Sequence, residues 1–226
     1  SNSSAASDVY KRQEYRTSAK LASIKLIGVA GLCSGAGTTQ MCIMLAVFMG
    51  KVLKKKTAVA GDEVTYSLML RQMQKAAAIQ HKGIASRHAY SMDGIDYYCG
   101  IRDEDIGILR QKYDVIILDI SFENTFDNTN VTFARMVSRL SACDEKILAG
   151  SMLPWKSREC EKKMERIERF LDIRGLKMVT LAACDKEAVS IIKKHGVEVV
   201  LIPFERNPFI ISGENLRSFL ELLKIT

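Results

Sequence analysis

The fold is indicated by the stretch IKLIGVAGLCSGAGTT, which spans residues 24–39. Its first part, Ile24–Ala30, is a short apolar run rich in β-branched residues, as is typical of a buried strand. Three glycines follow between Gly31 and Gly37, and the apolar segment Thr39–Lys51 then reads as a core helix. Such a strand–loop–helix turn suits a phosphate cradle, because glycines let consecutive backbone N–H groups face an anion and the helix start adds positive charge.

The rest of the chain alternates short apolar runs with segments of helical periodicity. Strands are predicted at Thr57–Ala60, Ile95–Cys99, Tyr113–Ile120, Lys146–Ser151, Lys177–Ala183 and Glu198–Phe204. Helices are predicted at Ser67–Ala78, Val131–Leu140, Lys156–Leu171, Lys186–His195 and Glu214–Lys224. This alternation predicts a single α/β domain with three layers and a doubly wound, mostly parallel sheet. Ligands bind such sheets at the carboxyl ends of the strands.

The domain is expected to cover residues 23–226. Residues 1–22 include SNSSAASDVYKRQ, which has no hydrophobic period and resembles a cloning remnant, so this part is predicted to be a disordered lead or a cloning-derived segment. With 226 residues and 47% hydrophobic composition, the chain suffices for one sizeable core. No apolar run approaches the roughly 20 residues that a membrane helix requires.

Charge and cysteine usage make several classes of function less favoured. The net charge is +7, but no cluster of Arg and Lys is interleaved with aromatic residues, which favours a role in solubility over nucleic-acid binding. The six cysteines form no CxxC pair and no histidine completes a zinc spacing. The pattern therefore predicts reduced thiols in a cytoplasmic protein.

The glycine-bearing loop resembles the KGGxGKTT variant of the phosphate-binding loop in the ParA/MinD (SIMIBI) superfamily of P-loop NTPases. On that alignment Cys33 stands where the signature lysine sits, Thr38 replaces the second lysine, and Thr39 matches the hydroxyl that binds magnesium. The strict Walker pattern GxxxxGK[ST] is absent. The run YDVIILD, Tyr113–Asp119, resembles a Walker B strand.

The resemblance implies a set of site residues. Those expected to hold ATP or ADP are Gly31, Ser34, Gly35, Ala36, Gly37, Thr38, Thr39, Pro203 and Phe204. Thr39 and Asp119 are the expected Mg²⁺ ligands, and Asp62, after the second strand, matches the catalytic aspartate that orients water. More ordinary readings stay open: a helix cap or loop role for Asp119, a core aromatic in Phe204, and a loop that binds nothing, which would leave the protein without a cofactor.

The missing lysines decide between possible functions. Losing one such charge commonly costs about 3 kcal/mol of transition-state stabilisation, on the order of a hundredfold in rate. The sequence therefore favours a non-hydrolysing or very weakly hydrolysing scaffold or switch for localisation or assembly, similar to the CpaE/TadZ-like branch. The alternatives are an active ATPase that receives a cation in trans on dimerisation, and a DNA-associated partitioning protein.

The resemblance also implies partners. It suggests a homodimer across the nucleotide face and a protein partner that the sequence does not identify. In this superfamily a carboxy-terminal amphipathic helix often mediates membrane association. Here Glu214, Arg217, Glu221 and Lys224 sum to zero charge, which favours docking of that helix on the chain's own sheet over intrinsic binding to a membrane surface.

Overall fold

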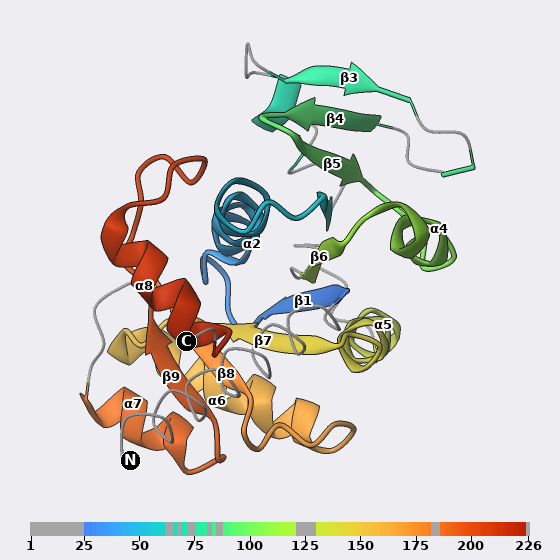
Figure 1. Cartoon of the computed structure of the whole chain (residues 1–226). Coiled ribbons are helices and arrows are strands. Elements are labelled where there is room, and N and C mark those ends of the chain that lie inside the picture. Colours follow the sequence, from blue (N-terminus) through green and yellow to red (C-terminus); the bar gives the residue numbers. More distant parts are fainter. Residues whose placement is uncertain are drawn as a thin grey trace, which may run out of the picture.

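The computed structural model describes residues 25–61, 66, 69–71, 76–80, 83–84, 88–120, 130–181 and 186–224. The predicted lead, residues 1–22, lies outside the described residues. The described part of the chain contains one continuous nine-stranded sheet with helices on both faces (Figure 1). The predicted fold class is therefore confirmed.

The strands follow the order β3-β4-β5-β2-β6-β1-β7-β8-β9 across the sheet. Their bounds are β1 (Leu26–Gly31), β2 (Thr57–Gly61), β3 (Ala77–Ile79), β4 (His88–Met92), β5 (Ile95–Cys99), β6 (Val115–Ile120), β7 (Glu145–Ala149), β8 (Lys177–Thr180) and β9 (Glu198–Leu201). The helices are α2 (Thr38–Val47), the π-helical turn η1 (Phe48–Val52), α4 (Asp105–Lys112), α5 (Asn130–Ser141), α6 (Pro154–Glu168), α7 (Lys186–Lys193) and α8 (Gly213–Leu222).

The centre of the sheet is parallel and buried on both faces. Every residue of β1 and β6 is buried, and these two strands pair in parallel with Val29 opposite Asp119. Continuous apolar runs are expected for strands covered by helices on both faces. Because β1 lies between β6 and β7, its carboxyl end and the following loop meet residues that are distant in the sequence.

One edge of the sheet departs from the prediction. A helix was expected to run as far as Ala78, but Ala77–Ile79 form β3, and the strand β4 was missed. Both strands pair antiparallel, β3 with β4 and β4 with β5. The three residues of β3 are only partly covered, so their sequence carries little burial pattern, and cross-strand pairing decides the conformation.

The helices form two outer layers. Figure 1 shows α2 and α8 on one side of the central strands and α4 and α5 on the other. Helix α2 is apolar around nearly its whole circumference, because most of its residues are buried and it packs against β1, β2 and β6. Phe48 of η1 stacks on Phe219 of α8 with ring centroids 5.4 Å apart. Helix α8 also contacts β9, so it docks on the chain's own sheet as predicted.

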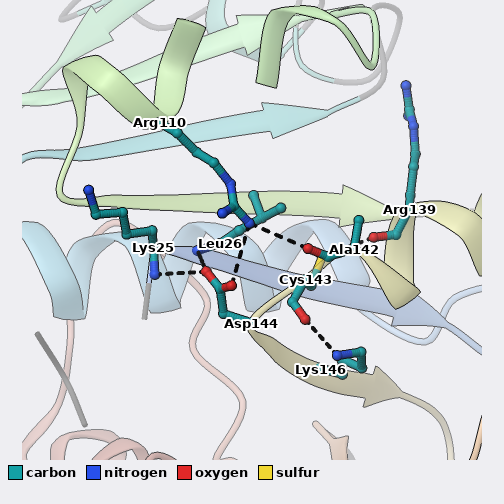
Figure 2. A network of polar contacts seen from close by, with 8 residues as sticks. All are labelled: Lys25, Leu26, Arg110, Arg139, Ala142, Cys143, Asp144 and Lys146. Carbon is teal, nitrogen blue, oxygen red and sulfur yellow. Dashed lines mark hydrogen bonds and ion pairs between the residues drawn. The ribbon is translucent and has the colours of Figure 1, made fainter. Parts of the chain in front are cut away.

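Two aspartates fix the amino ends of the central strands, opposite the edge where ligands are expected. Asp144 Oδ2 accepts hydrogen bonds from the backbone N–H groups of Lys25 (3.0 Å) and Leu26 (2.8 Å), as Figure 2 shows. Arg110 approaches the other carboxylate oxygen at 3.5 Å. In the same way Asp114 Oδ2 accepts from the N–H of Lys56 at 2.8 Å, just before β2. These contacts hold the start of each strand in register with its neighbour.

Within the described residues, no helix combines the length and apolar character that crossing a bilayer would require.

Candidate functional site

The loop between β1 and α2 lies at the carboxyl ends of the central strands. The N–H of Leu32 donates to the carbonyl of Ala149, at the end of β7, over 2.8 Å. Gly35 and Gly37 have φ values of 71° and 78°, which favour glycine. The N–H of Met41 then bonds to the Gly37 carbonyl at 2.8 Å and starts α2. The predicted strand, loop and helix are thus present in the expected order.

Thr38 occupies the second lysine position of the resemblance, and its side chain turns away from solvent. Its exposed fraction is 7%. A Cβ added to Gly31 would lie 2.7 Å from Thr38 Oγ1, so the hydroxyl is packed against the end of β1. No Lys or Arg occurs between residues 31 and 39. The loop itself therefore offers a ligand only backbone N–H groups, hydroxyls and the partial charge of the helix start.

Thr39 and Asp119, the two residues expected to bind Mg²⁺, lie in direct contact. Thr39 Oγ1 donates to Asp119 Oδ2 over 2.7 Å, and the hydroxyl of Tyr66 donates to the same oxygen over 2.9 Å. Asp119 lies within β6 and is only 4% exposed, so the alternative interpretation of Asp119 as a helix cap or loop residue was wrong. Burial and the Asp119 charge together raise the pKa of Tyr66 well above its usual value, so the phenol stays protonated and remains a donor. Hydroxyl and carboxylate oxygens are ligands that Mg²⁺ prefers.

The turn after β9 is held against the first turn of α2. Gln40 Nε2 donates to the carbonyl of Glu205 over 2.7 Å. The Glu205 carboxylate accepts from the Ser212 N–H (3.2 Å) and from Asn215 Nδ2 (2.9 Å), and these bonds lower the pKa of Glu205. Phe204 is 63% exposed, so the interpretation of Phe204 as a core aromatic was wrong. Its ring and the half-buried Pro203 are available to a ligand.

Helix α6 contributes residues that sequence reasoning missed. Glu159 Oε1 accepts a hydrogen bond from the N–H of Ser34 over 3.2 Å, and its other oxygen pairs with Lys156 Nζ over 3.1 Å. Cys160 forms a hydrogen bond with Cys33, which lowers the pKa of Cys33 to about 7. The sequence shows these α6 residues only as parts of an amphipathic helix, and nothing in their spacing points to residue 34.

The remaining predicted residues are placed as follows. Ala36 is buried beside the loop backbone, and its N–H bonds to the Cys33 carbonyl at 3.3 Å. A Cβ added to Gly37 would collide with Leu181, whereas the corresponding position on Gly35 is open. Asp62 lies outside the described residues, so its catalytic role stays a prediction.

Comparison with known proteins identifies the fold. No protein-family model and no curated protein matches the chain. Among solved structures, MinD in the MinC:MinD cell division complex of Aquifex aeolicus is similar, with a TM-score of 0.62 and 13% identity over 88% of this chain and 94% of that one. The septum site-determining protein MinD of Pyrococcus horikoshii, complexed with Mg-ADP, has a TM-score of 0.56 and 16% identity, with 88% and 94% covered.

A ParA family ATPase from Chlorobium tepidum is also similar, with a TM-score of 0.53, 14% identity, and 90% and 95% of the two chains covered. At these identities the likeness concerns the fold. The chain has the α/β fold of MinD- and ParA-type P-loop proteins over nearly its whole described length.

Proposed function

We propose that the chain binds ATP or ADP with Mg²⁺ at the loop of residues 31–39 and acts as a non-hydrolysing or very weakly hydrolysing switch or scaffold. The observation that carries this proposal is the 2.7 Å hydrogen bond between Thr39 and Asp119. It joins a hydroxyl at the start of α2 to a buried carboxylate on β6, next to the loop that would hold phosphate. Both groups would serve as oxygen ligands of Mg²⁺ or of its bound water.

The contact between Ser34 and Glu159 supports an anion-binding character of the loop. The Glu159 carboxylate, which is an anion, accepts a hydrogen bond from the backbone N–H of Ser34 in the loop. Backbone N–H groups at a helix start attract phosphate for the same electrostatic reason. The carboxylate also opposes a phosphate at that position, because like charges at close range repel. This repulsion favours weak or conditional nucleotide binding.

The absence of a lysine in the loop supports the lack of brisk hydrolysis. Thr38 places a hydroxyl against Gly31 where the resemblance expects an ammonium group. Charge that develops on the transferring phosphoryl group would lose a stabilising partner, at a cost of about 3 kcal/mol. Binding depends less on that charge, since the N–H groups and the hydroxyls remain.

The proposed cellular role follows the CpaE/TadZ-like branch: a cytoplasmic protein that helps to localise or assemble a partner. The exposed ring of Phe204 lies on the turn that Gln40 ties to the start of α2, and a nucleotide base could stack on it. The same edge of the sheet would then form a homodimer across the nucleotide face. The MinD of Aquifex aeolicus with this fold was solved in a complex with MinC, which supports a protein partner for this chain as well.

A thermal-shift series with ATP, ADP and GTP, each with Mg²⁺, tests the proposal. A nucleotide at a hundred times its dissociation constant should add about 2.7 kcal/mol of stability. The shift should shrink in Thr39→Ala and be retained in Thr39→Ser, which keeps the hydroxyl. If no nucleotide shifts the transition, nucleotide binding is refuted.

Turnover assays separate the remaining functions. Brisk ATP hydrolysis that is independent of protein concentration would refute the non-hydrolysing part of the proposal. A specific activity that rises with protein concentration would instead support a cation supplied in trans. Steeply salt-dependent DNA binding would support the partitioning alternative.

A further inference from the structure

The loop and helix α6 bring two cysteines together at the end of β7. Cys33 is 7% exposed and Cys160 is fully buried, and each thiol shifts the pKa of the other more than any other group does. The backbone on either side of Cys33 is tied to the same region. Leu32 bonds to Ala149, and Ser34 bonds to Glu159, the residue before Cys160. The bonds of the neighbouring residues therefore hold Cys33 beside the part of α6 that carries Cys160, although the two residues are 127 positions apart (160 minus 33).

The second sulfur is positioned from both sides. Cys160 Sγ lies 3.7 Å from the carbonyl oxygen of Ser151, just beyond β7. A Cβ added to Gly150 would lie 3.3 Å from the same sulfur, so the glycine leaves room for it. Cys160 thus sits on a rigid helix and against a strand end, and only Cys33 belongs to a loop.

The two thiols are electrostatically unequal. The hydrogen bond from Cys160 lowers the pKa of Cys33 to about 7, with Lys156 acting in the same direction. The pKa of Cys160 is raised, first by its bond to Cys33 and then by burial. By contrast, burial raises the pKa of Cys143 to about 12 and that of Cys42 well above its usual value. Thiolate is the reactive form, so Cys33 is the expected nucleophile among these four thiols.

We propose that Cys33 and Cys160 form a redox modification site in which a hydroperoxide converts the two thiols into a disulfide that fastens the loop to α6. The Cys33 thiolate attacks one oxygen of hydrogen peroxide, and the O–O bond breaks, which leaves a sulfenic acid on Cys33 and releases hydroxide. The Cys160 sulfur then attacks the Cys33 sulfur, loses its proton to that hydroxide and displaces a second hydroxide, which takes up the proton freed when the Cys33 thiol ionised. In total two thiols and one peroxide give one disulfide and two water molecules.

The disulfide would restrict the movement of the loop relative to helix α6. Without the bond, Cys33 can part from Cys160 whenever the loop moves. With the bond, residues 32–34 stay against α6, and Glu159 stays beside the Ser34 N–H. This inference does not depend on nucleotide binding, because the chemistry requires only the two sulfur atoms and an oxidant.

Peptide mapping of the full native chain tests the proposal. The protein is treated with one equivalent of hydrogen peroxide, remaining thiols are alkylated, and the digest is analysed by mass spectrometry with and without dithiothreitol. The expected product is a cross-linked peptide that contains Cys33 and Cys160, about 2 Da lighter than the sum of its reduced parts and cleaved by dithiothreitol. A bond from Cys33 to another cysteine, Cys184 included, or two unreacted thiols in the treated native protein, would overturn the proposal.

Variants assign the two roles. Cys160→Ser should let sulfenic acid accumulate at Cys33, where dimedone traps it, and Cys33→Ser should abolish both the cross-link and the label. Cys143→Ser is the matched control and should leave the cross-link unchanged. The oxidation rate of the wild type should rise through about pH 7, following the Cys33 thiolate. A rate that rises only near pH 8.5, as for an ordinary thiol, would contradict the assignment of Cys33 as the nucleophile.

Discussion

Thr39 Oγ1 and Asp119 Oδ2 lie 2.7 Å apart although their residues are 80 positions apart in the chain. The contact joins the first turn of α2 to the last part of β6, and Tyr66 donates to the same carboxylate oxygen. Such an arrangement satisfies a buried charge with two hydroxyl donors, which a buried carboxylate requires. It also places two oxygen ligands next to the loop of residues 31–39. The tests of nucleotide binding above therefore begin with Thr39.

The first prediction concerns the tight fit of the loop against Leu181. Gly37→Ala should destabilise the protein by about 2–3 kcal/mol, because its φ of 78° disfavours a side chain and the new methyl group would meet Leu181. Gly35→Ala is the matched control, since its φ is 71° but the space beside it is open, and about 1 kcal/mol is expected. Urea denaturation measures both. Equal losses in the two variants would contradict the steric part of the argument.

The second prediction concerns Glu159, whose carboxylate accepts a hydrogen bond from the loop at Ser34. Glu159→Gln should tighten binding of ATP or inorganic pyrophosphate about tenfold, because it removes a negative charge beside the Ser34 N–H. Isothermal titration calorimetry at fixed ionic strength measures the change. Glu165→Gln on the exposed side of α6 is the control and should leave the affinity unaltered. Weaker binding in Glu159→Gln would show that the carboxylate helps to hold the ligand.

The third prediction is a pH dependence that arises from Lys163. Burial lowers the pKa of Lys163 to about 8, and it is set among Glu159, Cys33, Cys160 and Arg166. Between about pH 8 and the unfolded value near 10.4, the unfolded chain binds more protons, so Lys163 makes stability rise with pH in this window.

Lys163→Met should therefore be more stable than the wild type at pH 7, by about 1 kcal/mol after solvent screening. The difference should vanish toward pH 10. Cys33 ionises nearby, gives the same sign of slope and interacts with Lys163, so the comparison is made in a Cys33→Ser background. Lys162→Met, at an exposed position of the same helix, is the control. Urea titrations at pH 7, 8, 9 and 10 measure the difference, and a gap that stays constant with pH would contradict the assignment.

The fourth prediction concerns the anchor at the other end of β1. Asp144→Ala should cost about 2–3 kcal/mol of unfolding free energy, because the N–H groups of Lys25 and Leu26 lose their acceptor and Arg110 loses a partner. Asp144→Asn keeps one carbonyl oxygen and should lose about half as much. Denaturant midpoints measured side by side decide the matter. Identical losses would show that charge, and not hydrogen bonding, accounts for the effect.

Much of the fold could be predicted from local patterns. The run Tyr113–Asp119 is mainly apolar because β6 is buried on both faces. Burial of this kind requires apolar residues, so it can be recognised from the sequence. The same holds for the glycines at positions 35 and 37, whose positive φ values demand glycine in the turn from β1 to α2. The strand β3 could not be found in this way, because none of its three residues is buried. In β4 three of five residues are buried, but they do not alternate with exposed ones, so antiparallel pairing with β3 and β5 decides the strand.

The features of the candidate site also fall into two groups: those that the sequence predicts and those that depend on the tertiary structure. The sequence alone determined a glycine-bearing loop without lysine and a carboxylate at the end of an apolar strand, because both depend on residue type and short spacing. Only the tertiary structure decided that Glu159 would reach Ser34, 125 positions away, and that Cys160 would meet Cys33. Those contacts depend on which strands become neighbours in the sheet, and β7 joins β1 through packing over the whole core. The sequence of α6 itself does not indicate which strand the helix will lie beside.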